Sequence, residues 1–200
     1  MSKNKILLTK NQNHPNTTDI KIFGFWIYLM SDCIIFATLF TIYITLVNNT
    51  NTGPTIQDIC TLPHVFVETI FLLSSSITYS MALITLKYNK TKEINIWLIF
   101  TAILGISFVY IELQELYYLV KQGYGPNFSA FLSSFFTLLS THNLHVILGI
   151  FWILIMIVQI HYQGTTLRNQ ILLKCLGLFW HFLDIIWIIL ITIVYLLQII

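Results

Sequence analysis

The sequence predicts an all-α membrane protein, a bundle of five transmembrane helices. Of its 200 residues 56% are hydrophobic and only 9% are charged, far from the balance of soluble domains. The apolar residues gather in five runs, at about 22–47, 64–86, 94–120, 130–160 and 174–197. At about 1.5 Å per residue, a helix of each run crosses a hydrocarbon core about 30 Å thick. We therefore expect a tail at residues 1–21 and a single transmembrane domain at residues 22–200.

The positions of the charges predict the direction in which the chain crosses. Nine of the ten basic residues lie in the tail and in the connections that follow the second and fourth runs, and only Lys121 lies on the other side. Because basic segments stay in the cytoplasm, we expect a cytoplasmic N-terminus and a periplasmic C-terminus. The net charge of +2 follows from this topology. With no exposed basic domain, we expect no nucleic-acid partner.

Three of the five runs are followed by residues that favour a turn. The first run is too long for the apolar core of a signal peptide, so we expect it to stay as a span; it gives way to an Asn- and Thr-rich segment ending at Pro54. Gly123 and Pro126 follow the third run, and Gly164 follows the fourth. Short connections favour antiparallel packing of consecutive helices. The default architecture is therefore an up-and-down bundle.

Eight carboxyl and imidazole groups lie inside the runs, in two predicted layers. The layer near the bilayer middle contains Asp32, His142, His145, His181 and Asp184, and the outer layer contains Glu68, Glu112 and Glu115. A charge at the centre of a membrane helix costs about 2.5–3.5 kcal/mol on insertion scales. We therefore expect these groups to turn inward and to pair or be neutral. Residues three apart, such as His181 and Asp184, share one helix face.

The three midplane histidines allow two interpretations. Facing transmembrane histidines commonly hold a b-type haem, and they also form hydrogen bonds between helices. The residues favour hydrogen bonding, because a spacing of three between His142 and His145 does not place two ligands on opposite faces of a haem. For Asp32, a proton-accessible carboxylate and a packing hydrogen bond stay equally open.

The outer glutamates and the deep tryptophans need partners as well. For the outer layer of glutamates, the sequence favours hydration by water at the membrane interface. Trp180 and Trp187 lie deep in the last run, so their ring N–H groups need acceptors inside the bundle. We expect His181 and Asp184, or a neighbouring subunit, to supply them.

Three segments of the chain resemble subunit III of the haem–copper respiratory oxidases. They are Lys21–Cys33 (KIFGFWIYLMSDC), Phe135–Val146 with the element THNLH, and Phe179–Trp187 (FWHFLDIIW). The similarity covers about residues 20–198. The five-span form, with Glu112 and Glu115, is most similar to the bacterial cytochrome o ubiquinol oxidase subunit III.

This resemblance implies a non-catalytic accessory subunit in a bacterial inner membrane. Haems and copper would lie in the catalytic subunit I, which with subunits II and IV would complete a complex that oxidises quinol, reduces dioxygen and pumps protons. Phospholipid would be a neighbour, and the three midplane histidines would hold no cofactor. Asp32 would stand where larger relatives have a carbodiimide-reactive glutamate. A haem-binding anchor, subunit III of a cytochrome c oxidase and a stand-alone proton channel stay open as alternatives.

Overall fold

The computed structural model of the chain consists of helices joined by short connections. It describes residues 13–47, 62–88 and 90–196. The helices are α2 (Asn13–Leu46), α4 (Leu62–Leu86), α5 (Thr91–Lys121), α6 (Ala130–Gln163), α7 (Leu167–Ile191) and the short π-helix η1 (Thr192–Leu196). Five of them contain a stretch long and apolar enough to cross a membrane. The prediction of an all-α protein is confirmed, and so is the prediction of five helices long and apolar enough to span a membrane.

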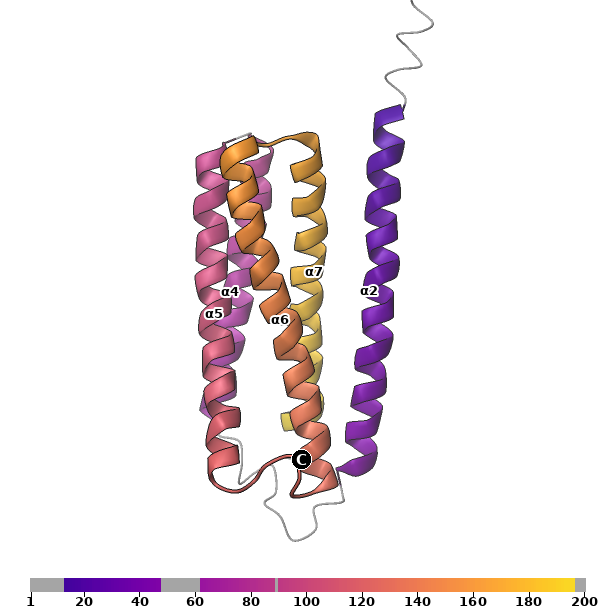
Figure 1. Ribbon diagram of the computed structural model, residues 1–200, viewed down its shortest axis with the longest axis vertical. Helices are drawn as coiled ribbons and strands as arrows, with labels where there is room; N and C mark the ends of the chain where they lie inside the picture. The colour runs from indigo at the N-terminus through magenta and orange to yellow at the C-terminus, as the bar shows by residue number, and fades with distance from the viewer. Residues whose placement is uncertain (1–12, 48–61, 89, 197–200) are drawn as a thin grey trace, which may run out of the picture.

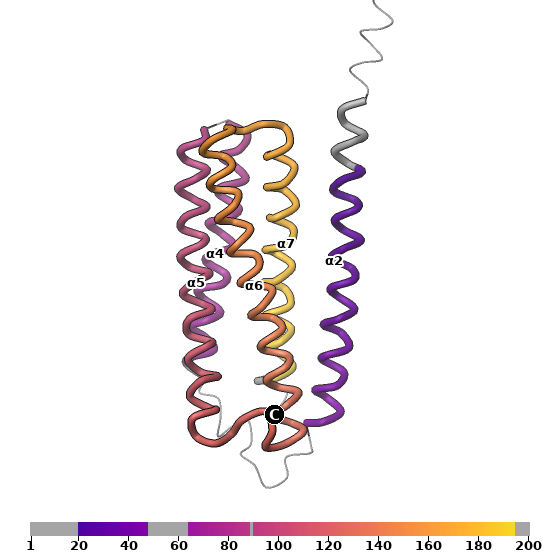
Figure 2. The backbone as a smooth tube through the Cα atoms, in the orientation of Figure 1, coloured from indigo at the N-terminus to yellow at the C-terminus, as the bar shows by residue number. Residues whose placement is uncertain are grey.

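Four helices form a bundle, and the fifth lies along its outside (Figure 1). In the bundle α4 packs against α5 and α7, and α6 packs against the same two helices. The outer helix, α2, packs mainly against α6 and α7, and it stays apart from α4 and α5 along its length (Figure 2). Consecutive helices run in opposite directions, as predicted. The helices α2 and α4 follow one another in the chain but are not close neighbours in the bundle.

Side-chain caps set two of the helix starts. The Ser129 hydroxyl accepts a hydrogen bond from the Leu132 backbone N–H at 3.1 Å at the start of α6. The Thr166 hydroxyl accepts one from the Asn169 N–H at 3.4 Å at the start of α7. These bonds satisfy backbone donors that have no partner inside the helix. Between the two helices, Gly164 adopts φ +66°, a left-handed conformation that glycine reaches without strain.

Several helices extend beyond the predicted apolar runs. Helix α2 begins at Asn13, upstream of the run predicted from residue 22, and α7 begins at Leu167, upstream of residue 174. At its other end α6 continues to Gln163. Polar turns continue a helix beyond the hydrocarbon at no desolvation cost, so hydropathy marks the apolar part of a helix and not its ends.

Trp180 fills the centre of the four-helix bundle because glycines on two other helices make room for it. A Cβ atom added to Gly105 of α5, or to Gly149 of α6, would lie 3.0 Å from the indole ring. On α7 itself, a Cβ on Gly177 would lie 2.8 Å from Cε1 of Tyr79 on α4. Small residues let helix backbones approach closely, and packing of this kind holds helices together in lipid, where burial of apolar surface provides little driving force.

We expect Gly177→Ala to destabilise the bundle by about 1–3 kcal/mol, the usual effect of overpacking. The Tyr79 ring cannot shift freely, because its hydroxyl donates a hydrogen bond to the Leu173 carbonyl at 2.7 Å. Gly24→Ala is the matched control, since no atom lies within 4 Å of its added Cβ. Thermal melting of the detergent-purified protein compares the two variants. Equal melting temperatures would contradict the packing described here.

Candidate functional site

Two indole hydrogen bonds join α7 to α4 inside the bundle. The Trp180 ring N–H donates to Ser75 Oγ at 3.0 Å, and the Trp187 ring N–H donates to Thr69 Oγ1 at 3.3 Å. Each hydroxyl passes its own hydrogen to a carbonyl one turn earlier in α4. A hydroxyl donates once and can accept twice, so each of these two groups uses its donor and one of its two acceptor positions. Together with the bond from Tyr79 to Leu173, these contacts form the α4–α7 seam.

His181 and Asp184 lie on α7 near the two tryptophans, but they do not accept the indole hydrogens. That part of the sequence prediction is wrong, because α4 supplies hydroxyl oxygens closer to the two rings. Instead Nδ1 of His181 lies 2.8 Å from Ser76 Oγ and 3.6 Å from Oδ2 of Asp184. The predicted sharing of one helix face by His181 and Asp184 is seen in this pair.

Asp32 and His145 face one another where α2 packs on α6. Asp32 Oδ2 lies 4.0 Å from His145 Nε2, and the two side chains are 7% and 15% exposed. His145 Nδ1 lies 2.8 Å from the carbonyl oxygen of Thr141. Because a carbonyl can only accept, Nδ1 must carry a hydrogen, and Nε2 of a neutral ring then has a free lone pair. The pair can therefore hold one proton on either residue, as a neutral pair or as an ion pair.

His142 is fully buried and contacts α7. Its Nε2 lies 3.4 Å from the Leu183 carbonyl oxygen, to which it donates. The imidazole stacks on Trp187 at 5.2 Å between ring centroids, and the edges of Phe108 and Phe36 complete the surroundings at 5.9 Å and 6.5 Å. Among the residues that the structure describes, no group of three or more His, Cys, Asp or Glu is arranged to hold a metal ion.

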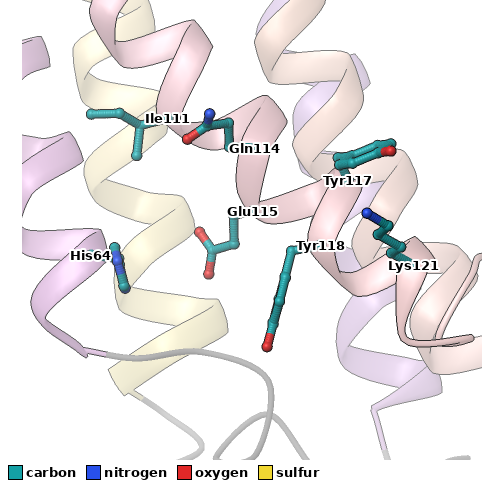
Figure 3. A pocket seen from close by; sticks show the side chains of 7 residues that line it. All are labelled: His64, Ile111, Gln114, Glu115, Tyr117, Tyr118 and Lys121. Atoms are coloured by element: carbon teal, nitrogen blue, oxygen red, sulfur yellow. The ribbon is translucent and has the colours of Figure 1, made fainter.

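The three outer glutamates form an acidic cluster between α4 and α5. Glu68 and Glu112 are fully buried, and no described residue forms a hydrogen bond with any of their carboxyl oxygens. Their charges interact with one another and with Glu115. Glu115 reaches the edge of the cluster and lines a cavity of about 610 Å³ beside His64 (Figure 3). The predicted outer layer is thus a cluster with two enclosed members and one at a cavity.

A second cavity, of about 600 Å³, lies between α5 and α6 at the opposite end of the bundle. Its lining divides into a polar part at the helix ends and an apolar part along the helices. The polar residues are Lys92, Asn95, His161 and Tyr162, and the apolar residues are Ile96, Ile99, Ile157 and Val158. Such a groove can hold an ionic group at one end and a hydrocarbon chain along its length.

The hydroxyls of α4 that form hydrogen bonds with the indoles and the His181 imidazole could not be recognised from the sequence. Ser75, Ser76 and Thr69 carry no charge and no distinctive motif, and serine or threonine in a membrane helix usually bonds to its own backbone. The available signal was the run of three serines at 74–76 inside an otherwise apolar segment.

The sequence as a whole matches a known family. The family model described as Cytochrome c oxidase subunit III matches residues 8–199. The chain belongs to this subunit III family. The resemblance to subunit III of the haem–copper oxidases, predicted from three short segments, is therefore confirmed over nearly the entire chain.

Relatives of this subunit III chain cover most of its length. A cytochrome bo(3) ubiquinol oxidase subunit 3 of Pseudomonas aeruginosa is 47% identical over 175 residues, 88% of this chain and 84% of the relative. The protein of the same name from Buchnera aphidicola subsp. Baizongia pistaciae is 44% identical over 176 residues, 88% and 91% of the two chains. A cytochrome c oxidase subunit 3 of Alkalihalophilus pseudofirmus is 36% identical over 189 residues, 92% of each chain.

Asp184→Leu should weaken the protein by about 1 kcal/mol, the usual net contribution of one polar contact, because His181 Nδ1 keeps its contact with Ser76 Oγ. Asp184 is buried, and leucine would remove the carboxyl group that lies 3.6 Å from His181 Nδ1. Asp184→Asn keeps the shape and the hydrogen-bonding capacity of the side chain, so this control variant should lose less stability. The measurements are the yield and melting temperature of the purified protein. A leucine variant as stable as the wild type would contradict this role.

Proposed function

We propose that this chain is the non-catalytic subunit III of a cytochrome bo(3) ubiquinol oxidase. Such a complex oxidises quinol, reduces dioxygen to water and translocates protons in aerobic respiration. The observation that carries the proposal is the identity of 44–47% to proteins of that name over 88% of the chain. The identity of 36% to a cytochrome c oxidase subunit 3 makes that complex the second candidate.

The environment of the histidines supports an accessory role. His142 and His145 each direct one ring nitrogen at a backbone carbonyl, and His181 directs one at Ser76. The contacts of His142 and His181 join two helices, and the contact of His145 lies within α6. Three aromatic rings surround His142. We therefore place the haems and copper in the catalytic subunit I. Subunits II and IV complete the proposed complex.

The orientation follows from charge and from the arrangement of the helices. The connection from α4 to α5, with Lys87 and Lys90, lies at the same end of the bundle as the start of α2 (Figure 1). The connection from α6 to α7 lies at this end too, and Arg168 is in the first turn of α7. Lys121 ends α5 at the opposite end. The positive-inside rule places the first end in the cytoplasm of a bacterial inner membrane. Labelling of a cysteine introduced at Arg168, from the cytoplasmic side only, would report this orientation.

The groove between α5 and α6 supports phospholipid as a partner. At the proposed cytoplasmic end, Lys92 and His161 can receive an anionic head group, and the isoleucine-rich floor can receive an acyl chain. Basic pockets between membrane helices bind acidic lipids in this way. Native mass spectrometry should find less retained phospholipid after Lys92→Gln than after Lys121→Gln, a lysine that does not line this groove. Equal retention would contradict the assignment.

Copurification tests the proposed function most directly. The tagged chain, extracted in mild detergent from cells that contain its partners, should bring a haem–copper subunit and ubiquinol oxidase activity with it. The polypeptide separated from that complex should show no stoichiometric haem absorbance. Absorbance that stays with the separated chain would favour the haem anchor. Oxidation of cytochrome c without oxidation of quinol would favour the second candidate, and a pH-driven current from liposomes with this chain alone would favour a channel.

A further inference from the structure

The acidic cluster between α4 and α5 has features that bundle packing does not require. Glu68 and Glu112 are 0% exposed. All four of their carboxyl oxygens, and one of Glu115, are buried without a hydrogen-bond partner among the described residues. Buried polar groups in folded proteins are almost always bonded, so these oxygens need another explanation.

Among the residues that the structure describes, no lysine or arginine forms an ion pair with the cluster, although Lys121 lines the same cavity as Glu115. The Lys121 amine lies over the Tyr117 ring, 5.7 Å from its centroid, and the one basic group whose charge acts on the cluster is His64, through Glu115. Residues 130–141 of α6 and 185–194 of α7 contain no titratable side chain. The next one on α6 is His142, whose ring packs against Phe108, one turn before Glu112 on α5. Three carboxylates in such a place would repel each other in a medium of low dielectric constant, so ionisation of all three is strongly disfavoured.

The cluster has one point of contact with open space. Glu115 lines the cavity of about 610 Å³ together with His64 and Tyr118, and its carboxyl group is on the side that faces His64 (Figure 3). The charges of Glu115 and His64 act on each other, and those of Glu68 and Glu112 act on Glu115 or on each other. The electrostatic contacts thus run from the enclosed acids through Glu115 to the cavity.

We propose that Glu68, Glu112 and Glu115 form a proton-binding site. Glu68 and Glu112 are held as carboxylic acids, which removes the repulsion, and Glu115 exchanges their protons with the cavity. In each exchange an O–H bond of the Glu115 acid breaks and a bond to a water oxygen or to a His64 ring nitrogen forms. An enclosed acid then passes its proton to the Glu115 carboxylate. The ligand is the proton, since the described residues form no group arranged to hold a metal ion.

Infrared spectroscopy of the full chain, purified with the partners it retains, tests the proposal at neutral pH. A carboxylic acid and a carboxylate absorb at separate C=O stretching frequencies. Glu68→Gln and Glu112→Gln should each lose carboxylic-acid absorbance. The control is Glu93→Gln, an exposed glutamate 2.7 Å from Lys90, which should lose carboxylate absorbance only. If both cluster variants behave like the control, the proposal is wrong.

The rate of deuterium exchange tests the exchange route. On transfer to D2O the carboxylic-acid absorbance of the cluster, identified by those differences, should shift with time. Glu115→Gln should slow this shift several-fold, and an unchanged rate would overturn the role of Glu115.

A measurement on the unaltered protein covers the case in which the variants fail to assemble. A hydrophobic carbodiimide modifies protonated carboxyl groups, and peptide mass spectrometry locates the adduct. An adduct on Glu68 or Glu112, with none on Glu93, supports the site. Full reaction of other buried carboxyls with neither Glu68 nor Glu112 modified overturns it.

Discussion

The structure depends on one constraint, which is that hydrocarbon offers no partner to a polar group. Polar groups inside the five spans must therefore find partners within the bundle or a neighbouring subunit, or be held neutral as we propose for the enclosed glutamates. The α4–α7 seam meets this requirement. Its indoles donate to hydroxyls that are themselves bonded to the α4 backbone, and the close approach of the helices depends on glycines that admit the rings of Trp180 and Tyr79. Polar pairing and small-residue packing thus act together on the same helices.

The same constraint explains how α2 is attached. It lies outside the four-helix bundle and meets α6 through Asp32 and His145, with Phe36 packed against the His145 ring at 5.2 Å between centroids. Much of its remaining surface is apolar and exposed, which suits lipid or the apolar surface of another subunit. A bundle with broad apolar faces suits a subunit of a membrane oxidase complex, because it offers lipid and neighbouring subunits a large apolar surface.

Much of this could be predicted from the sequence, because hydropathy, charge asymmetry and helical periodicity are local properties. The five runs, the burial of Asp32, His142 and Asp184, and the pairing of His181 with Asp184 follow from them. The neighbours of α2 could not be predicted, since they depend on packing between helices far apart in the chain. The prediction of the indole acceptors was wrong for the same reason. Ser75 is 105 residues from Trp180, and nothing in the sequence around Ser75 indicates that it accepts a hydrogen bond. The different partners of His142 on α7 and of His145 on α2 likewise depend on the positions of those helices.

Hydrogen bonds across the α4–α7 seam help to hold the bundle together. A double-mutant cycle of Ser75→Ala and Trp180→Phe measures the coupling free energy between the two side chains, from the unfolding of each purified variant in detergent. The cycle separates this coupling from the cost of the cavity that each substitution leaves by itself. Couplings between hydrogen-bonded side chains in membrane proteins average about 0.6 kcal/mol and reach about 1.7 kcal/mol. A favourable coupling in this range is the predicted result. Strictly additive losses would contradict it.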